Sequence, residues 1–231
     1  MTADTLDIVF VWAGMFLAIV LLAMATWQRV FRTMPIFFCY LVWCVCSATV
    51  VPAALHLSAE NYLRYFLLSM AIDDSFHFAI LAELGRAVLR YNDAASPKRS
   101  TLVLLMTLAI VLVWSLGRWV FPTRLPAIQL TYVLLLQGFA ILRVACLLTL
   151  AWWSSLHAFR WPTRALQIAS GFGVYAVVSL GTALLHTHGM TGMQYHWLDQ
   201  IQVASYLGAL SYWVLAFGTK EAESEILVPN R

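Results

Sequence analysis

Uncharged apolar runs long enough to cross a lipid bilayer are the feature that most limits how this chain can fold. Such runs extend from Ile8 to Gln28, Ser100 to Gly117, Leu125 to Leu142 and Gln200 to Thr219. Hydrocarbon cannot satisfy backbone N–H and C=O groups, so a segment that spans a membrane must be a helix or part of a closed barrel. Because these runs are continuous and lack the polar and apolar alternation of membrane strands, they predict transmembrane helices.

The composition excludes two classes of protein. The chain has 231 residues, of which 62% are hydrophobic and 11% charged, whereas soluble domains have roughly 45–50% apolar and 25% charged residues. The formal net charge is only +3, and no basic block is present that could neutralise a nucleic-acid backbone. We therefore expect neither a soluble globular domain nor a nucleic-acid partner, but a single all-α transmembrane domain over residues 1–231.

Seven membrane-spanning helices account for the hydropathy pattern. The apolar stretch from Ala165 to Leu198 is too long for one crossing and divides at the polar residues 186–189. The helix over residues 62–88 is kept as a span although acidic residues interrupt its apolar run, because omitting it would leave long hydrophobic segments on one side of the membrane. The predicted helices cover residues 8–28, 34–55, 62–88, 101–121, 127–152, 164–186 and 197–219.

The distribution of Lys and Arg predicts the orientation of the bundle, since short cytoplasmic loops are enriched in these residues. With the N-terminus outside and the C-terminus in the cytoplasm, the outer side receives only Arg64, Arg118 and Arg124. The cytoplasmic side then receives Arg29, Arg32, Arg86, Arg90, Lys98, Arg99, Arg160, Arg164, Lys220 and Arg231.

The four cysteines all fall inside predicted helices, at Cys39, Cys44, Cys46 and Cys146. Their positions favour small apolar residues that permit close helix packing over a disulfide framework.

Three polar residues near the middle of the third predicted helix, Asp73, Asp74 and His77, form the strongest candidate site. At ~1.5 Å per residue they lie about 17–23 Å into a hydrocarbon layer roughly 30 Å thick. Ionisable groups at this depth normally face the interior of a bundle and carry function. The histidine is three and four positions from the two carboxylates, so its imidazole can reach either of them and share a proton.

Two interpretations of this centre stay open. It is either a proton-responsive or ligand-orienting site, or a hydrogen-bonded cluster that ties the third helix to its neighbours. Residues at a similar depth that could complete it are Gln137, Tyr175, Ser179 and Tyr206.

A second pair, Glu83 and Arg143, lies in the inner halves of the third and fifth predicted helices. An isolated arginine in lipid costs several kcal/mol unless it pairs or reaches the interface, and Glu83 is the nearest acidic residue in depth. We expect a structural ion pair here, with a gate as the alternative.

A third cluster lies on the predicted outer side and consists of His186, His188, His196 and Asp199. Histidine and aspartate are competent zinc ligands, so these four side chains are a candidate metal site. Because their spacing matches no known metal-binding motif, a set of solvated interfacial histidines is the favoured interpretation.

Two families of seven-helix membrane proteins are similar in topology but differ in their chemistry. Rhodopsins hold retinal on a lysine of the last helix, whereas the lysines here are Lys98, in a loop, and Lys220, at the membrane edge. We expect no retinal. Alkaline ceramidases place two zinc-binding histidines in the last helix, and the helix over 197–219 has none after His196. No catalytic role is carried over from either family.

Two segments of the chain resemble a family of bacterial seven-helix membrane proteins with no assigned activity. They are Arg32–Leu41 (RTMPIFFCYL), at the start of the second predicted helix, and Glu83–Tyr91 (ELGRAVLRY), at the end of the third. The resemblance extends over most of the chain and implies a multi-pass protein of the bacterial cytoplasmic membrane.

These features favour a non-enzymatic protein that senses or binds a small apolar or lipid-like ligand through Asp73, Asp74, His77 and Gln137. Membrane lipids are the other expected partners, and no cofactor is required. The alternatives are a zinc-dependent intramembrane lipid hydrolase that uses the outer histidines and a proton-coupled carrier that uses the centre on the third helix.

Overall fold

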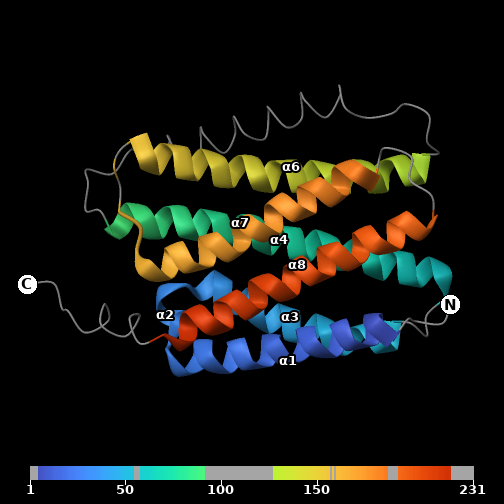
Figure 1. The fold of residues 1–231 in the computed structure, drawn as a ribbon, viewed down its shortest axis with the longest axis horizontal. Helices are drawn as coiled ribbons and strands as arrows, with labels where there is room; N and C mark the ends of the chain where they lie inside the picture. Colours follow the sequence, from blue (N-terminus) through green and yellow to red (C-terminus); the bar gives the residue numbers. More distant parts are fainter. Residues whose placement is uncertain are drawn as a thin grey trace, which may run out of the picture. The chain divides into compact units, whose positions relative to one another are not determined.

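The computed structural model describes residues 5–54, 58–91, 127–156, 158, 160–186 and 192–219, and within these ranges all regular secondary structure is helical. The predicted all-α class is confirmed for this part of the chain. The helices are α1 (Thr5–Trp27), α2 (Val30–Thr33), α3 (Pro35–Ala54), α4 (Ala59–Tyr91), α6 (Ala127–Leu156), α7 (Thr163–His186) and α8 (Gly192–Gly218) (Figure 1).

Five of these helices contain a segment that is long and apolar enough to cross a membrane: Val9–Trp27, Arg64–Tyr91, Gly138–Leu156, Thr163–Leu185 and His196–Gly218. Helix α3 contains a shorter apolar segment, Pro35–Val50. By length and composition, these helices mark a multi-pass helical membrane protein. The helix expected over residues 101–121 lies outside the described residues.

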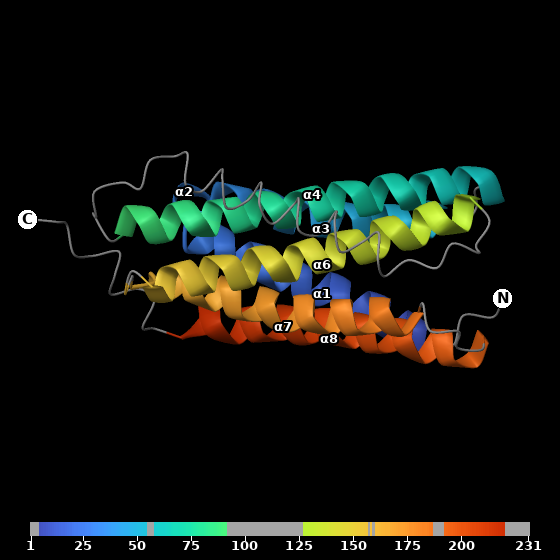
Figure 2. The same ribbon diagram turned by 90° about the horizontal axis from the view of Figure 1, so that it is seen from above.

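The helices form two compact units. The first unit comprises Met1–Glu83 and Tyr206–Arg231, and the second comprises Leu84–Ser205, so α4 and α8 each contribute to both. In the second unit α6 and α7 pack against each other (Figure 2). The single domain expected over 1–231 stays a prediction.

In the first unit, α1 and α3 lie side by side and are joined by the short helix α2 (Figure 1). Helix α1 ends at Trp27, and Arg29 adopts the left-handed conformation, with φ 55° and ψ 34°, before α2 begins. Helix α3 then begins at Pro35, a position where the missing N–H of proline costs nothing. The side-chain amide of Gln28 donates a hydrogen bond of 2.6 Å to the carbonyl oxygen of Phe217 and so ties this turn to the end of α8.

Aromatic packing dominates the core of the first unit. Phe37 is fully buried, and its ring centroid lies 5.3 Å from that of Trp213 in an edge-to-face arrangement and 6.1 Å from that of Phe217. Helices α1 and α8 approach closely at Gly14, where a Cβ atom would lie 3.3 Å from Cδ2 of Leu207. Small residues at such points allow membrane helices to pack tightly.

In the second unit, polar side chains link successive helices. The indole N–H of Trp161 donates a hydrogen bond of 2.6 Å to the hydroxyl of Ser154, which bridges the turn between α6 and α7. The hydroxyl of Thr182 donates to the side-chain carbonyl of Gln202 at 3.2 Å and joins α7 to α8. Hydrogen bonds of this kind hold helices together where lipid removes the hydrophobic driving force.

Large apolar side chains also cover the outer faces of the helices. Such exposure is costly in water but not in lipid, because acyl chains are as apolar as the side chains themselves. The most exposed include Trp12, Phe16, Leu68, Leu148, Trp152, Val174 and Leu215.

Candidate functional site

Helix α4 presents Asp73, Asp74 and His77 together, because residues three and four apart lie on one helix face. His77 is 1% exposed and Asp74 is 5% exposed. The side chain of Asp73 keeps 36% of its surface exposed. The three side chains therefore lie together on α4, two of them buried and one at the edge of the cluster, and their role as a site stays a prediction.

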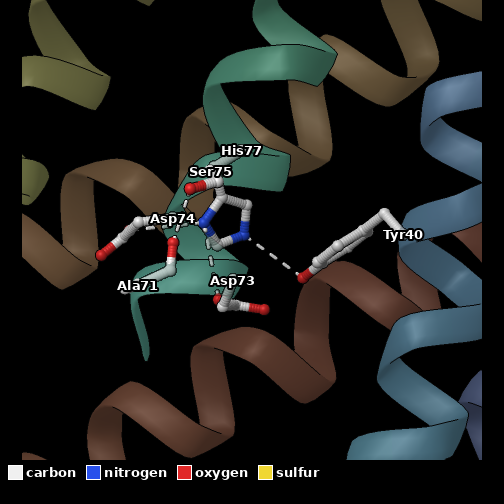
Figure 3. Close-up of polar contacts among 6 residues, drawn as sticks. All are labelled: Tyr40, Ala71, Asp73, Asp74, Ser75 and His77. Carbon is white, nitrogen blue, oxygen red and sulfur yellow. Dashed lines mark hydrogen bonds and ion pairs between the residues drawn. The ribbon is translucent and has the colours of Figure 1, made fainter. Parts of the chain in front are cut away.

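The imidazole of His77 lies between the two carboxylates and a tyrosine of α3 (Figure 3). Its Nδ1 atom is 3.6 Å from Oδ2 of Asp73 and 3.6 Å from Oδ1 of Asp74. Its Nε2 atom is 3.2 Å from the hydroxyl oxygen of Tyr40. The contact between Nε2 and the Tyr40 hydroxyl joins α4 to α3, and the tautomer of the imidazole decides which of the two groups donates.

Tyr40 is the member of the site that sequence reasoning missed. It is 2% exposed and lies on α3 shortly after Pro35. A tyrosine inside an apolar helix is a usable signal, because its hydroxyl needs a hydrogen-bond partner once it is buried. Nothing in the linear sequence, however, gives the register that places this hydroxyl opposite His77.

Polar contacts continue from Tyr40 to a third helix. The buried thiol of Cys44 forms side-chain hydrogen bonds with the hydroxyls of Tyr40 and Tyr206 and lies in the field of the Asp73 carboxylate. Tyr206, on α8, is one of the residues expected to complete the centre. The polar cluster in the first unit thus draws on α3, α4 and α8.

Aromatic rings pack beside this cluster. The ring centroid of Tyr40 lies 5.3 Å from that of His77 and 6.1 Å from that of Phe76, which in turn is 6.2 Å from the ring of Trp43. Apolar surroundings of this kind lower the local dielectric and strengthen each polar contact within them. The packed rings also limit the rotamers of Tyr40 and His77, whose side chains contact each other.

Glu83 has a role that sequence reasoning did not foresee. Its two carboxylate oxygens accept hydrogen bonds, each of 2.9 Å, from the backbone N–H groups of Ile36 and Phe37. These groups belong to the first turn of α3, whose N–H groups have no partner within the helix. Glu83 therefore caps α3 from α4, and the negative charge complements the positive end of the helix dipole.

Arg143 lies in the second unit, whereas Glu83 lies in the first, and the predicted ion pair between them stays a prediction. Arg143 is 5% exposed, and its guanidinium carbon lies 5.3 Å from the ring centroid of Tyr175 on α7. This cation–π contact stabilises a buried charge within the second unit.

Two expected partners of the His77 centre, Tyr175 and Ser179, also belong to the second unit. The side chain of Gln137 on α6 lies outside the described residues.

The predicted outer metal cluster is described only in part. His188 and the side chain of His186 lie outside the described residues. Nε2 of His196 is 3.0 Å from the side-chain nitrogen of Gln200, and Asp199 is exposed. Within the described ranges, no group of three or more His, Cys, Asp or Glu side chains could hold a metal ion. The zinc site stays a prediction.

Comparisons of this chain with protein families, with curated proteins and with solved structures returned no match. Its functional assignment rests on the chemistry of the site.

Proposed function

We propose that this chain is a seven-span protein of the bacterial cytoplasmic membrane, with its N-terminus outside, that binds a small apolar or lipid-like ligand at the His77 centre. The five long apolar helices and the shorter apolar segment of α3 support the multi-pass arrangement. The concentration of Lys and Arg at one set of loops supports the orientation.

The ligand proposal rests on one observation: two carboxylates, an imidazole and a phenol lie at a contact between apolar helices. Asp74 and His77 are buried, whereas the side chain of Asp73 is 36% exposed. The site therefore has a preorganised interior and an accessible acceptor at its edge. A ligand with a hydrogen-bond donor would bind to the Asp73 carboxylate and keep its apolar part against the neighbouring aromatic rings.

Mass spectrometry of the small molecules that co-purify with the protein tests this proposal. We expect a ligand that is retained by the wild type and lost from Asp73→Asn and His77→Asn. Ser75→Ala is the matched control, because the exposed Ser75 hydroxyl only donates to the carbonyl of Ala71 in its own helix (Figure 3). A ligand content that is the same in all four proteins would refute ligand binding at this centre.

A proton-coupled carrier is the second candidate, because the carboxylates and the imidazole of this centre are groups that take up and release protons. A protonated carboxyl group of Asp73 or Asp74 that gives its proton to the imidazole of His77 and later takes it back would load and release one proton at this centre. Uptake of the co-purified ligand by proteoliposomes would support this function if it depends on a proton gradient and fails in His77→Asn. Ligand binding without uptake would favour the first proposal.

A further inference from the structure

The turn between α1 and α2 presents two arginines and two aromatic rings on its exposed side. Arg29 and Arg32 are exposed, as are Trp27, at 87%, and Phe31, at 42%. Trp27 is also the last residue of the apolar segment Val9–Trp27. Tryptophan and arginine at the end of a membrane span are suited to the level of the lipid headgroups.

Buried contacts hold this turn in one conformation. Val30 is 5% exposed, so the turn is anchored to the core of the first unit on its other side. The backbone N–H of Arg32 donates a hydrogen bond of 3.0 Å to the carbonyl of Arg29, which places the two arginines one helical turn apart. The guanidinium of Arg32 lies 5.8 Å from the ring centroid of Phe31.

The backbone of Arg29 adds a second argument. Its left-handed conformation, with φ 55°, is one that glycine adopts freely and that an arginine adopts at a cost. A left-handed glycine would serve the turn better than arginine if the turn alone mattered. We therefore attribute the arginine at this position to its side chain and not to the needs of the turn.

An apolar stripe leads along α1 to these arginines. Trp12, Phe16, Ile19, Ala23 and Trp27 are all exposed and follow one another at helical spacings of three and four residues. The stripe extends about 22 Å at 1.5 Å per residue, which exceeds one leaflet of a roughly 30 Å hydrocarbon core. It is long enough for the acyl chains of one lipid whose headgroup lies at Arg29 and Arg32.

We propose that this surface binds an anionic phospholipid, with the phosphate at Arg29 and Arg32 and the acyl chains along the stripe on α1. Two arginines one turn apart supply positive charge and planar donors that match phosphate oxygens. The aromatic rings lie at the junction between headgroup and acyl chain. The site is separate from the His77 centre and does not depend on its function.

Titration of fluorescent phosphatidylglycerol into the detergent-solubilised full chain tests this inference. We expect Arg29→Gln and Arg32→Gln each to weaken binding about fivefold and the double variant about 25-fold. Arg64→Gln removes an exposed arginine near the start of α4, outside the proposed surface, and should leave the affinity unchanged. Unlabelled phosphatidylglycerol should displace the probe, whereas phosphatidylcholine and inorganic phosphate should not.

Arg29→Gly separates the charge from the backbone, because glycine keeps the left-handed turn and removes the guanidinium. It should weaken binding as much as Arg29→Gln does. The inference is wrong if Arg29→Gly or the double variant binds like the wild type, or if Arg64→Gln weakens binding equally. Displacement by phosphatidylcholine would show a nonspecific lipid surface, and displacement by phosphate alone would show a simple anion site; either result overturns the proposal.

Discussion

The Nε2 atom of His77 on α4 lies 3.2 Å from the hydroxyl oxygen of Tyr40 on α3, and both residues are almost completely buried. This contact connects the carboxylates of α4 to a helix that contains no charged residue. Further along the same pair of helices, Glu83 accepts hydrogen bonds from the first turn of α3. The two contacts fix α3 and α4 antiparallel and in register.

Tyr40→Phe tests the first of these contacts. Loss of the hydroxyl removes the hydrogen bond to His77, so the free energy of unfolding should fall by about 1 kcal/mol. The measurement is reversible unfolding in mixed micelles of increasing denaturant fraction. Tyr62→Phe is the matched control, because Tyr62 is 39% exposed on α4 and stacks on Phe66 through its ring. Equal losses in the two variants would contradict the account.

The two carboxylates should contribute unequally to the centre. Asp74 is buried and Asp73 is partly exposed, although both lie 3.6 Å from Nδ1 of His77. Burial holds the Asp74 carboxylate in one position beside His77, whereas the partly exposed Asp73 side chain keeps more rotamer freedom, so the coupling between Asp74 and His77 should exceed that between Asp73 and His77. Double-mutant cycles with Asp73→Asn, Asp74→Asn and His77→Asn measure both coupling energies. A larger value for Asp73 would disprove this order.

Glu83→Gln should weaken the start of α3. A carboxylate offers two acceptors to Ile36 and Phe37, whereas an amide offers one acceptor and turns a donor toward the second N–H group. We expect a loss of about 1.5–3 kcal/mol in unfolding free energy and faster hydrogen exchange at these two amides. Arg86→Gln, an exposed change on the same helix, serves as the control. Unchanged exchange at both amides would rule out the cap.

Phe37→Ala should be among the most destabilising substitutions in the first unit. Its ring is fully buried between Trp213 and Phe217, and its removal leaves a cavity that costs about 3–5 kcal/mol. Phe16→Ala removes a ring that is 65% exposed and should have little effect, since lipid fills the space. Thermal unfolding in detergent compares the two variants. Similar melting temperatures for them would show that Phe37 is not in the core.

The sequence was sufficient for those features that depend on local periodicity. Uncharged runs predicted helices that correspond to α1 and α8, and the spacing of Asp73, Asp74 and His77 placed them on one face of α4. These predictions succeed because hydropathy and helical geometry act within a single segment.

Features that depend on the register between helices were not predictable. Tyr40 and the backbone of α3 meet α4 only because the two helices pack at one particular offset, which no local pattern specifies. Depth in the membrane alone pairs Glu83 with Arg143 in the sequence. It does not reveal that the Glu83 carboxylate accepts hydrogen bonds from Ile36 and Phe37. Helix α2 was also missed, because four residues between two spans carry no periodic signal.

The depth of the His77 centre in the membrane is the central claim of this account. A nitroxide attached to the cysteine of Ser75→Cys measures this depth, because the side chain at this position is exposed and adjacent to Asp74. Cys39 and Cys46 are exposed and are replaced by serine, whereas Cys44 and Cys146 are buried and stay. In lipid nanodiscs we predict that power saturation detects strong relaxation by oxygen and little by a water-soluble nickel chelate. Strong relaxation by the nickel chelate would place α4 in water at this position and contradict the account.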